Sequence, residues 1–498
     1  MLQASADVVV VGGGPSGLVV AAEAAAGGAR VVLLEQRVEG TTSRAGTILP
    51  RVLEILDSRG LSGRIMKRAQ ETRSYPYDSG HIWAGFEWVE WRHLESRYGM
   101  TMMIPQGITE SILREWAAES GADCRYGWAA DDVEISETGA SVRGTGPEGA
   151  FEVRAPYVVG ADGVRSLVRD RAGIAFKGRP ASFTGVIADA YWDYRWPSGR
   201  RHFDNELGWV SAFQFGPGIT RFIMVHRDER NRPKGDPIDA VELSERLGEV
   251  IEEQIEFTEL ASASRFTDSH RIVDSFRTGP VFLVGEAARV HYPASGVGMN
   301  FCIQDAFNLG WKLGAVCAGH ADDALLDTYD TERRPVAQEL LQSVDAQVAI
   351  QFNFSPEGVA MKRRFAEHMF ELPDVQRHIC KELNGLTVAY DTQANDPLGG
   401  LPMPDIDVAT IGAEIVRIAE LLRDHRFVLL VLERNVDLDL GPFEELCSTV
   451  VCRATRRPAA LDGVDAVLIR PDGYVSWVRR TGEVTPTVEE HLKLLLGK

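Results

Sequence analysis

Three glycines near the start of the chain have the spacing of a turn that binds phosphate. Gly12, Gly14 and Gly17 fit the pattern G-x-G-x-x-G and follow four consecutive valines. The first glycine of this pattern allows a tight turn, the second lets the backbone approach a pyrophosphate, and the third lets a helix pack on the strand. The N-terminus of that helix presents free amides and a positive dipole end to phosphate. The turn predicts a dinucleotide site with these candidate residues: Gly12, Gly14, Pro15, Ser16 and Gly17.

Charged side chains follow at the end of the next apolar run. Residues 30–34 are predicted to form a strand, which Glu35 ends. A carboxylate at this place can accept hydrogen bonds from ribose hydroxyls. Gln36 and Arg37 adjoin it and are further candidates for nucleotide contacts. Arg44 precedes a predicted helix beside the nucleotide end, where it either contacts a phosphate or is solvated.

Two later segments again place small residues after a short apolar strand. Residues 157–160 precede an alanine and an aspartate, and residues 281–284 precede a glycine and a glutamate. A dinucleotide fold that is interrupted and resumed in this way points to bound flavin and to oxygen chemistry. The candidate residues in these segments are Asp162, Gly285, Glu286, Pro293, Gly296, Gly298, Met299 and Asn300.

The composition is that of a globular protein of several structural units. Among 498 residues, 44% are hydrophobic and 25% are charged, and the net charge is −19. Such a surface repels nucleic acid and anionic membranes, so neither is an expected partner. The sequence lacks a secretory signal, a run of apolar residues long enough to span a membrane, and a Cys/His ligand set. We therefore expect a cytoplasmic protein without a metal.

The elements that must position these residues belong to the α/β class. Apolar runs and helical patterns alternate around the glycine turns, with a predicted helix at 18–26. Two long helices are predicted at 300–318 and 327–352, the second broken by Pro335. Residues 176–275 are rich in predicted strands and indicate a second domain.

With all three segments in order, the chain resembles the class A FAD-dependent aromatic hydroxylases. The likeness is to bacterial polyketide-tailoring monooxygenases related to para-hydroxybenzoate hydroxylase and phenol hydroxylase. It rests on the first glycine turn, on residues 160–163, and on residues 285–313. It implies a Rossmann-like FAD-binding domain, an inserted sheet-rich (α+β) substrate domain and a C-terminal thioredoxin-like domain that is redox-silent because it has no Cys-x-x-Cys. The implied boundaries are 1–175 for the first part of the FAD-binding domain (with 74–100 contributing to the substrate domain), 176–275 for the substrate domain, 276–395 for the second part of the FAD-binding domain, and 396–498 for the thioredoxin-like domain.

The resemblance also implies roles for individual residues. Glu35 would bind the adenosine ribose, Arg44 the diphosphate side, and Gln106 the ribityl or phosphate region. Asp162 would help to fix the diphosphate and take part in the use of reduced nicotinamide. The remaining assignments concern the flavin ring. Backbone amides would lie against its pyrimidine edge, and Pro293 would lie beside the carbon that carries the peroxide; the amides are those of Gly296, Gly298, Met299 and Asn300.

The third segment departs from the family pattern at two positions. The family usually has Gly-Asp-Ala-Ala-His, whereas this chain has Glu286 in place of the aspartate and Arg289 in place of the histidine. Either the subfamily tolerates the changes, or the flavin is positioned differently. His291, between the third strand and Pro293, is a candidate to replace the missing histidine, so His291 and Pro293 are the candidate catalytic residues. His226 and His270 are further candidates for a base.

The implied reaction is hydroxylation of an aromatic polyketide, a polycyclic phenol or quinone, in antibiotic biosynthesis. NADPH, favoured over NADH by the resemblance, would reduce FAD, and O2 would then form a C4a-hydroperoxyflavin that the ring attacks. The aromatic-rich stretches 74–98 and 191–222 are candidates for the substrate pocket. One alternative is a Baeyer–Villiger oxygen insertion, and another is a non-catalytic flavin-binding or scaffold subunit. The oligomeric state stays open, with a homodimer among the alternatives.

Overall fold

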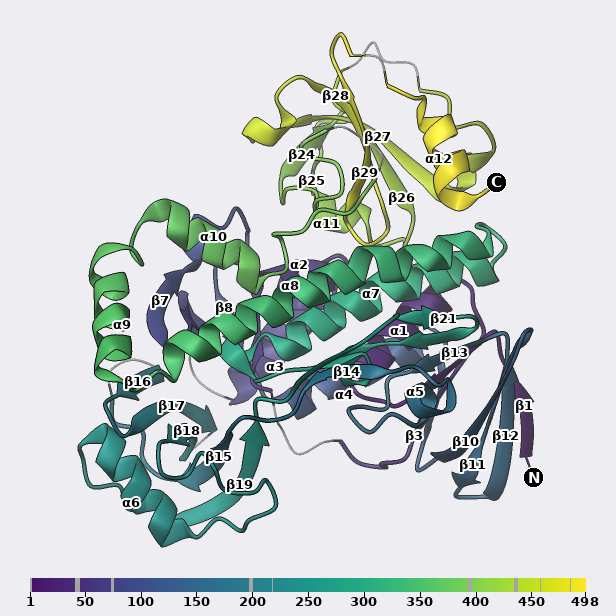
Figure 1. Cartoon of the computed structure of the whole chain (residues 1–498). Helices are drawn as coiled ribbons and strands as arrows, with labels where there is room; N and C mark the ends of the chain where they lie inside the picture. Colours follow the sequence, from purple (N-terminus) through teal and green to yellow (C-terminus); the bar gives the residue numbers. More distant parts are fainter. Residues whose placement is uncertain are drawn as a thin grey trace.

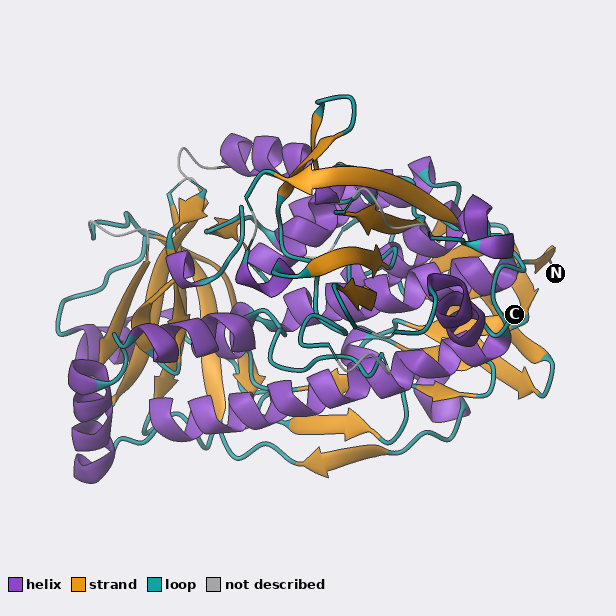
Figure 2. Ribbon diagram, turned by 90° about the horizontal axis from the view of Figure 1, so that it is seen from above, coloured by secondary structure: helices purple, strands orange, loops and turns teal. Residues whose placement is uncertain are grey.

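The computed structural model describes residues 2–40, 45–72, 76–196, 200–216, 218–392, 396–433, 438–456, 458–483 and 485–498. Two long helices, α7 (Gly298–Cys317) and α8 (Thr328–Gln351), run across the middle of the molecule (Figures 1 and 2). A five-stranded sheet lies at one end of these helices, and a four-stranded sheet of order β1-β12-β11-β10 lies at the other. The strands of the four-stranded sheet are β1 (Leu2–Ser5), β12 (Gly149–Ala155), β11 (Gly139–Gly146) and β10 (Ala129–Ser136). The C-terminal unit packs above them in the view of Figure 1.

A six-stranded sheet brings the three glycine segments together. In its core, β2 (Val8–Val11) pairs in parallel with β13 (Tyr157–Gly160) and with β3 (Val31–Glu35). On the side away from β2, β13 pairs in parallel with β22 (Val281–Leu283). Parallel strands end at the same edge of a sheet, where α/β proteins bind their ligands. The residues that follow β2, β13 and β22 therefore meet at one place. The full strand order is β21 (Arg277–Thr278), β22, β13, β2, β3 and β9 (Asp123–Tyr126).

The helix after the first turn packs closely on α7. It is α1 (Pro15–Ala26), which begins with proline at its first position, where the missing N–H costs no hydrogen bond. Gly310 of α7 allows the contact, because a Cβ there would lie 2.5 Å from Cβ of Glu23. The predicted break of α8 at Pro335 is wrong, since the helix runs through it. Glu332 and Arg333 are buried in ion pairs beside the proline, and this packing outweighs the lost backbone bond.

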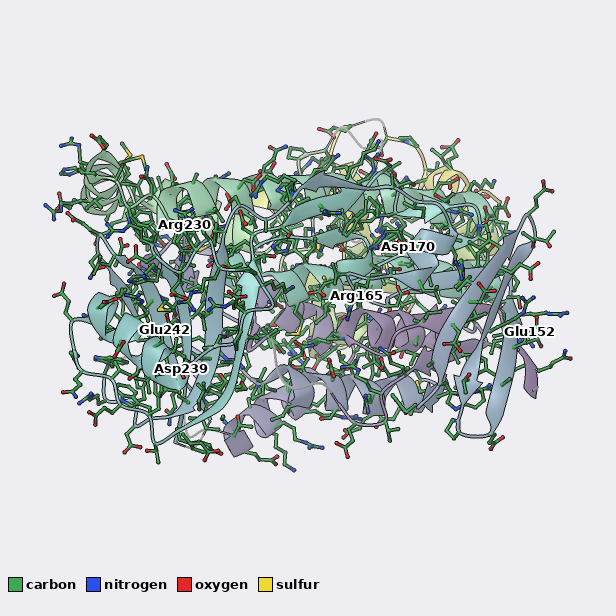
Figure 3. All side chains as sticks on the ribbon, turned by 60° about the horizontal axis from the view of Figure 1, so that its bottom comes forward. Glu152, Arg165, Asp170, Arg230, Asp239 and Glu242 are labelled. Atoms are coloured by element: carbon green, nitrogen blue, oxygen red, sulfur yellow. The ribbon has the colours of Figure 1, made fainter. Side chains whose placement is uncertain are left out.

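The strand-rich middle of the chain forms an antiparallel sheet of order β16-β17-β18-β15-β19. Its strands are β16 (Arg200–Asp204), β17 (Gly208–Gly216), β18 (Ile219–His226), β15 (Thr184–Tyr191) and β19 (Glu259–Thr267). One face is covered by α6 (Ala240–Ile251), whose apolar residues pack against it. Figure 3 labels Asp239, which caps this helix by accepting from the amides of Val241 and Glu242 at 2.9 and 3.0 Å. The opposite face of the sheet is not covered by α6.

A small hairpin lies beside this sheet. It consists of β6 (Gly80–Trp83) and β7 (Phe86–Glu90), from the aromatic-rich stretch of the sequence. A three-stranded sheet of order β4-β8-β5 adjoins it, formed by β4 (Thr47–Ile48), β8 (Thr101–Met103) and β5 (Tyr77–Asp78). Both are built from chain that follows the first glycine turn, so this region of the sequence reaches toward the five-stranded sheet.

The C-terminal unit contains a second six-stranded sheet, of order β25-β24-β27-β26-β28-β29. Here β26 (Phe427–Val431) is parallel to β27 (Cys447–Ala454) and antiparallel to β28 (Val464–Ile469). The chain then turns into β29 (Val475–Arg480) and ends in α12 (Val488–Leu496). Two shorter strands, β24 (Asp407–Thr410) and β25 (Ile415–Arg417), complete the edge. All six cysteines of the chain are free.

Buried ion pairs and hydrogen bonds anchor the C-terminal unit to helices α1, α7 and α8. Arg470, just before the β28–β29 turn, bonds Glu332 of α8 at 2.9 Å. Asp472 in the turn accepts from the indole N–H of Trp311 on α7 at 3.1 Å. Arg59 completes the contact, because it pairs with Glu23 of α1 at 2.7 Å and donates to two backbone carbonyls of the C-terminal unit.

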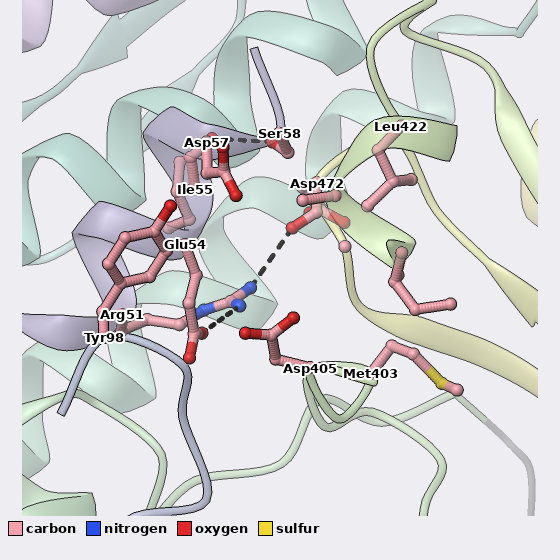
Figure 4. A pocket seen from close by; sticks show the side chains of 13 residues that line it. Arg51, Glu54, Ile55, Asp57, Ser58, Tyr98, Met403, Asp405, Leu422 and Asp472 are labelled. Atoms are coloured by element: carbon pink, nitrogen blue, oxygen red, sulfur yellow. Dashed lines mark hydrogen bonds and ion pairs between the residues drawn. The ribbon is translucent and has the colours of Figure 1, made fainter. Parts of the chain in front are cut away.

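A small cavity lies in the same junction. Figure 4 shows Arg51, Glu54 and Asp57 of α2 (Pro50–Asp57) facing Asp405 and Asp472 of the C-terminal unit. Its volume of about 30 Å³ is the share of one water molecule, far too small for a polycyclic ring. The cavity is therefore a seam between two packed units and is not the site of the aromatic substrate.

The two buried carboxylates of this junction predict its response to acid. Burial alone would raise the pKa of Glu23 and of Glu332, but Arg59 with His425 holds the first, and Arg470 with Lys312 the second, at about 2. Because the folded pKa lies below the ordinary 4.5, this stability is complete above pH 4.5 and is lost as the pH falls toward 2. In this range, each carboxylate lowers the free energy of unfolding by up to about 1.4 kcal/mol for every unit by which the pH falls. We expect the midpoint of urea unfolding to fall steeply between pH 4.5 and 3 in the native chain.

The matched variants separate this effect from general acid denaturation. The double variant Glu23→Gln, Glu332→Gln should start less stable and show a shallower fall over the same pH range. Glu119→Gln, which alters an exposed pair with Arg64, serves as the control and should keep the native slope. An unchanged slope in the double variant would show that other groups cause the acid sensitivity.

Candidate flavin site

The first glycine turn has the geometry that a bound pyrophosphate needs. Gly12 has φ +108°, and a Cβ there would lie 2.3 Å from the carbonyl oxygen of Ala161. At Gly17 a Cβ would lie 1.9 Å from the carbonyl oxygen of Gly12. At Gly14, by contrast, no atom lies within 4 Å of the Cβ position. The protein therefore leaves no space for a side chain at Gly12 or Gly17. It leaves open space at Gly14, the glycine that should face the phosphate.

Glu35 is held at the end of β3 by backbone and side-chain donors. Its carboxylate accepts from the amide of Gly13 at 2.7 Å and from the amide and Nε of Arg37 at 2.8 and 2.9 Å. Burial alone would raise the pKa of Glu35, but these bonds hold it below its usual value. The charged carboxylate fixes the turn through these bonds. Gln36 beside it is exposed, and Arg44 lies outside the described residues.

Asp162, which follows β13 at the same edge of the sheet, has an unsatisfied acceptor. One carboxylate oxygen accepts from the amide of Val168 at 3.1 Å, whereas Oδ1 is buried without a hydrogen-bond partner. Burial raises the pKa of this carboxyl group. A buried acceptor without a donor is costly, so a bound donor such as a nucleotide hydroxyl fits the position. Gln106, which begins α4 (Gln106–Glu119), accepts from the amide of Ala45 at 3.0 Å and so holds the segment that follows Arg44.

The third segment closes against the first turn. Gly285 has φ +67°, and a Cβ there would lie 2.6 Å from Oγ of Ser16 at the start of α1. Glu286 is exposed, in the short helix Gly285–Ala287. Arg289 instead points into the core, where it pairs with Asp305 of α7. Asp305 also pairs with Arg333 of α8 at 2.7 Å. The second departure from the family pattern is thus one arm of a buried triad.

The segment from Pro293 to Asn300 leads into α7 and presents its first amides. Pro293 is exposed, and Gly296 has φ +62°. Because α7 begins at Gly298, the amides of Gly298, Met299 and Asn300 have no acceptor within the helix and can stabilise negative charge. The side chain of Asn300 accepts from the amide of Leu49 at 2.8 Å, a contact between distant segments that sequence reasoning missed.

The candidate histidines fall in different surroundings. His291 is half-buried, and its Nδ1 lies 2.6 Å from the carbonyl oxygen of Tyr292, so this nitrogen carries the proton. Burial lowers the pKa of His291 to about 4, which keeps the ring neutral at pH 7. His226 and His270 lie beside Glu249 and Asp345, at 3.2 and 3.0 Å. Of these three, His291 is the one within the flavin segment.

His81 on β6 is a residue that sequence reasoning missed. Its Nε2 lies 2.6 Å from the carbonyl oxygen of Ser295, and its Nδ1 lies 3.1 Å from Oγ1 of Thr101. Burial lowers the pKa of His81 to about 3. A neutral ring that donates to Ser295 fixes the segment beside Pro293, where Ser295 has φ +50°. The only sequence signal was its place in the aromatic-rich stretch.

The fold and these three converging segments define a flavin-binding α/β protein with an additional five-stranded antiparallel sheet. Residues 5–344 match the family described as FAD binding domain, and the chain belongs to this family. Residues 396–498 match the family described as aromatic-ring hydroxylase, C-terminal. The predicted cofactor and enzyme class are confirmed: the protein is an FAD-dependent monooxygenase of the class A aromatic hydroxylase type.

Named relatives support the same class along the whole chain. The 12-dehydrotetracycline 5-monooxygenase/anhydrotetracycline 6-monooxygenase of Streptomyces rimosus is 32% identical over 483 residues, which cover 94% of each chain. The solved structure of OxyS anhydrotetracycline hydroxylase from Streptomyces rimosus has a TM-score of 0.88 at 32% identity, over 99% of each chain. The structure of CabE, an aromatic hydroxylase from angucycline biosynthesis, has a TM-score of 0.86 at 32% identity, also over 99% of each chain.

Two further properties concern the described ranges alone. Within them, no helix has the length and apolar character to cross a membrane. The same part of the chain holds no group of three or more His, Cys, Asp or Glu side chains arranged to bind a metal ion.

Proposed function

We propose that this protein hydroxylates a polycyclic aromatic polyketide in antibiotic biosynthesis, using FAD, O2 and NADPH or NADH. The observation that supports this most directly is the meeting of three flavin segments at one sheet edge, with a second sheet beside them whose inner face is not covered by α6. One relative, over 94% of the chain, is named as a 12-dehydrotetracycline 5-monooxygenase/anhydrotetracycline 6-monooxygenase, and a solved structure over 99% of the chain is named as an aromatic hydroxylase from angucycline biosynthesis. Bound FAD would accept hydride from the nicotinamide and activate O2 for transfer to the ring.

The residues of the chain have distinct tasks in this proposal. Gly14 and the N-terminus of α1 would bind the diphosphate, and Asp162 would accept from a donor on the nucleotide. The amides that begin α7 would stabilise negative charge at the flavin's pyrimidine edge. Pro293 would border the reacting oxygen, and the neutral His291 would accept a proton or hydrogen bond there. Packed aromatic side chains, including Tyr292 beside Phe183 and Phe352, would exclude water.

The division into domains follows the same proposal. Residues 1–175 and 276–395 would form a Rossmann-like FAD-binding domain, and 176–275 with 74–100 the substrate domain. Residues 396–498 would be thioredoxin-like. The parallel pair β26–β27, the antiparallel hairpin β28–β29 and the final helix α12 support that assignment. The predicted cytoplasmic location, the homodimer and the absence of nucleic-acid and membrane partners stay predictions.

The test begins with the visible spectrum of the purified protein, which should show the bands of oxidised flavin. Tetracyclic phenols should then stimulate NADPH oxidation, and the product should gain one oxygen atom on an unchanged carbon skeleton. A lactone product would instead indicate Baeyer–Villiger insertion. Failure to retain flavin, or retention of flavin without any NADPH oxidation, would favour the non-catalytic alternative and contradict the proposal.

A further inference from the structure

On the face of the five-stranded sheet away from α6, polar side chains lie at the edge formed by β16. We call His202 of β16 and Ser211 of β17 the polar cluster. Side chains alternate between the two faces of a strand. Phe203 of β16 and Val210 of β17 pair across the strands and pack on the α6 side. The neighbouring pair, His202 and Ser211, therefore lies on the opposite face.

This polar cluster is joined to the flavin segment through the β6–β7 hairpin. The amide of His202 donates to the carboxylate of Glu87 on β7 at 2.8 Å, and Arg200 pairs with Asp78 at 2.8 Å. On β6 of the same hairpin, His81 contacts Ser295, two residues after Pro293. The hairpin thus ties His202 and the segment beside Pro293 into one region of the molecule.

The ring of His202 has unused hydrogen-bonding capacity. It stacks on the indole of Trp209, with ring centres 5.5 Å apart and planes 19° apart. Its Nδ1 is buried, and neither ring nitrogen has a hydrogen-bond partner among the residues that the structure describes. His81, in contrast, has a partner at each nitrogen. Burial, together with the positive charge of Arg200, lowers the pKa of His202 well below its usual value, so the ring is neutral and one nitrogen is an acceptor.

We propose that His202 accepts a hydrogen bond from a phenolic hydroxyl of the substrate and so orients the ring for oxygen transfer. This inference rests on the proposed function and adds a specificity-determining residue to it. An unpaired nitrogen in a buried place is unfavourable, and a phenol O–H removes that deficit. The stacked Trp209 holds the imidazole plane, while an aromatic substrate brings the donor. A hydroxyl that shares its proton with nitrogen also makes its ring more electron-rich.

The proposal predicts discrimination between a phenol and its methyl ether. The ether has the same ring but no donor, so it leaves the acceptor nitrogen unpaired. A site that hydrogen-bonds a hydroxyl rejects the analogue that lacks it. A phenol with an ordinary pKa remains protonated at pH 7 and can donate.

The experiment uses the FAD-loaded protein with 2-naphthol and 2-methoxynaphthalene as probes, and follows the perturbation of the flavin spectrum on titration. Native protein should bind 2-naphthol about tenfold more tightly than the ether. His202→Phe should bind both within about twofold of each other, and His202→Gln, which keeps an acceptor, should restore part of the preference. His226→Gln changes a histidine on the α6 side of the same sheet and should keep the native ratio.

The outcomes separate this inference from the proposed function. Equal affinity of native protein for the two probes, absence of binding included, would overturn the role of His202. So would a native preference retained by His202→Phe. FAD content and the melting temperature should be unchanged in His202→Phe, so a folding defect is recognised directly. Loss of flavin from the native protein would instead contradict the proposed function.

Discussion

Gly14→Val is expected to give a folded protein that does not retain FAD. Gly14 has φ −75° and ψ 178°, a conformation open to any residue, and its Cβ position has no neighbour within 4 Å. The added isopropyl group would therefore occupy the space that a diphosphate needs and disturb little else. We expect FAD affinity to fall at least about 100-fold, or about 2.7 kcal/mol. Flavin absorbance of the purified protein and titration of the apoprotein with FAD measure the effect.

Two further glycine variants make this result specific. Gly12→Val should not give folded protein, because a side chain there would clash with Ala161 and would need φ +108°. Gly63→Val adds the same side chain at an exposed helical glycine with no neighbour within 4 Å, and should keep its flavin. Stoichiometric FAD in Gly14→Val would show that the diphosphate does not approach this turn.

Asp305→Ala is expected to cause a large loss of stability. Asp305 is 1% exposed and is the counter-ion of two buried guanidinium groups, those of Arg289 and Arg333. Its removal leaves two positive charges in the core without a partner, at a cost of about 3–5 kcal/mol. The midpoint of urea unfolding should fall accordingly, or the protein should become insoluble.

A compensating variant tests the cause. Removing one uncompensated cation with Arg289→Met should recover part of the stability that Asp305→Ala loses. Glu119→Ala breaks an exposed pair with Arg64 and should cost less than about 1 kcal/mol. If Asp305→Ala were no worse than Glu119→Ala, the triad would not hold α7 and α8 together.

The triad also bears on the two departures in the third flavin segment. From the sequence, Arg289 could indicate either a tolerated change or an altered position of the flavin. Its guanidinium lies within the core and pairs with Asp305, which is part of the same family-like stretch. This arrangement favours a structural role for the arginine. Glu286 is exposed, so the longer carboxylate has room to move.

The sequence by itself determined the local parts of the cofactor site. The four valines, the glycine spacing and the terminal Glu35 are encoded within one short segment, because strand, turn and helix start depend on neighbouring residues. The same holds for the strands before Asp162 and Gly285. The prediction that Pro335 breaks its helix was wrong, because burial and ion pairs of the adjacent residues keep the helix continuous.

Only the tertiary structure decided which distant residues meet. The contacts of Asn300 with Leu49, of His81 with Ser295, and of Arg289 with Asp305 and Arg333 depend on how sheets and helices stack. His202 shows the difference most clearly: the stretch 191–222 was a candidate for the substrate pocket, but nothing in the sequence singled out this histidine within it. Strand pairing turns it away from α6, and packing buries its Nδ1. Burial and the lack of a partner, which give a side chain its chemistry, are properties of the folded chain and leave no local pattern.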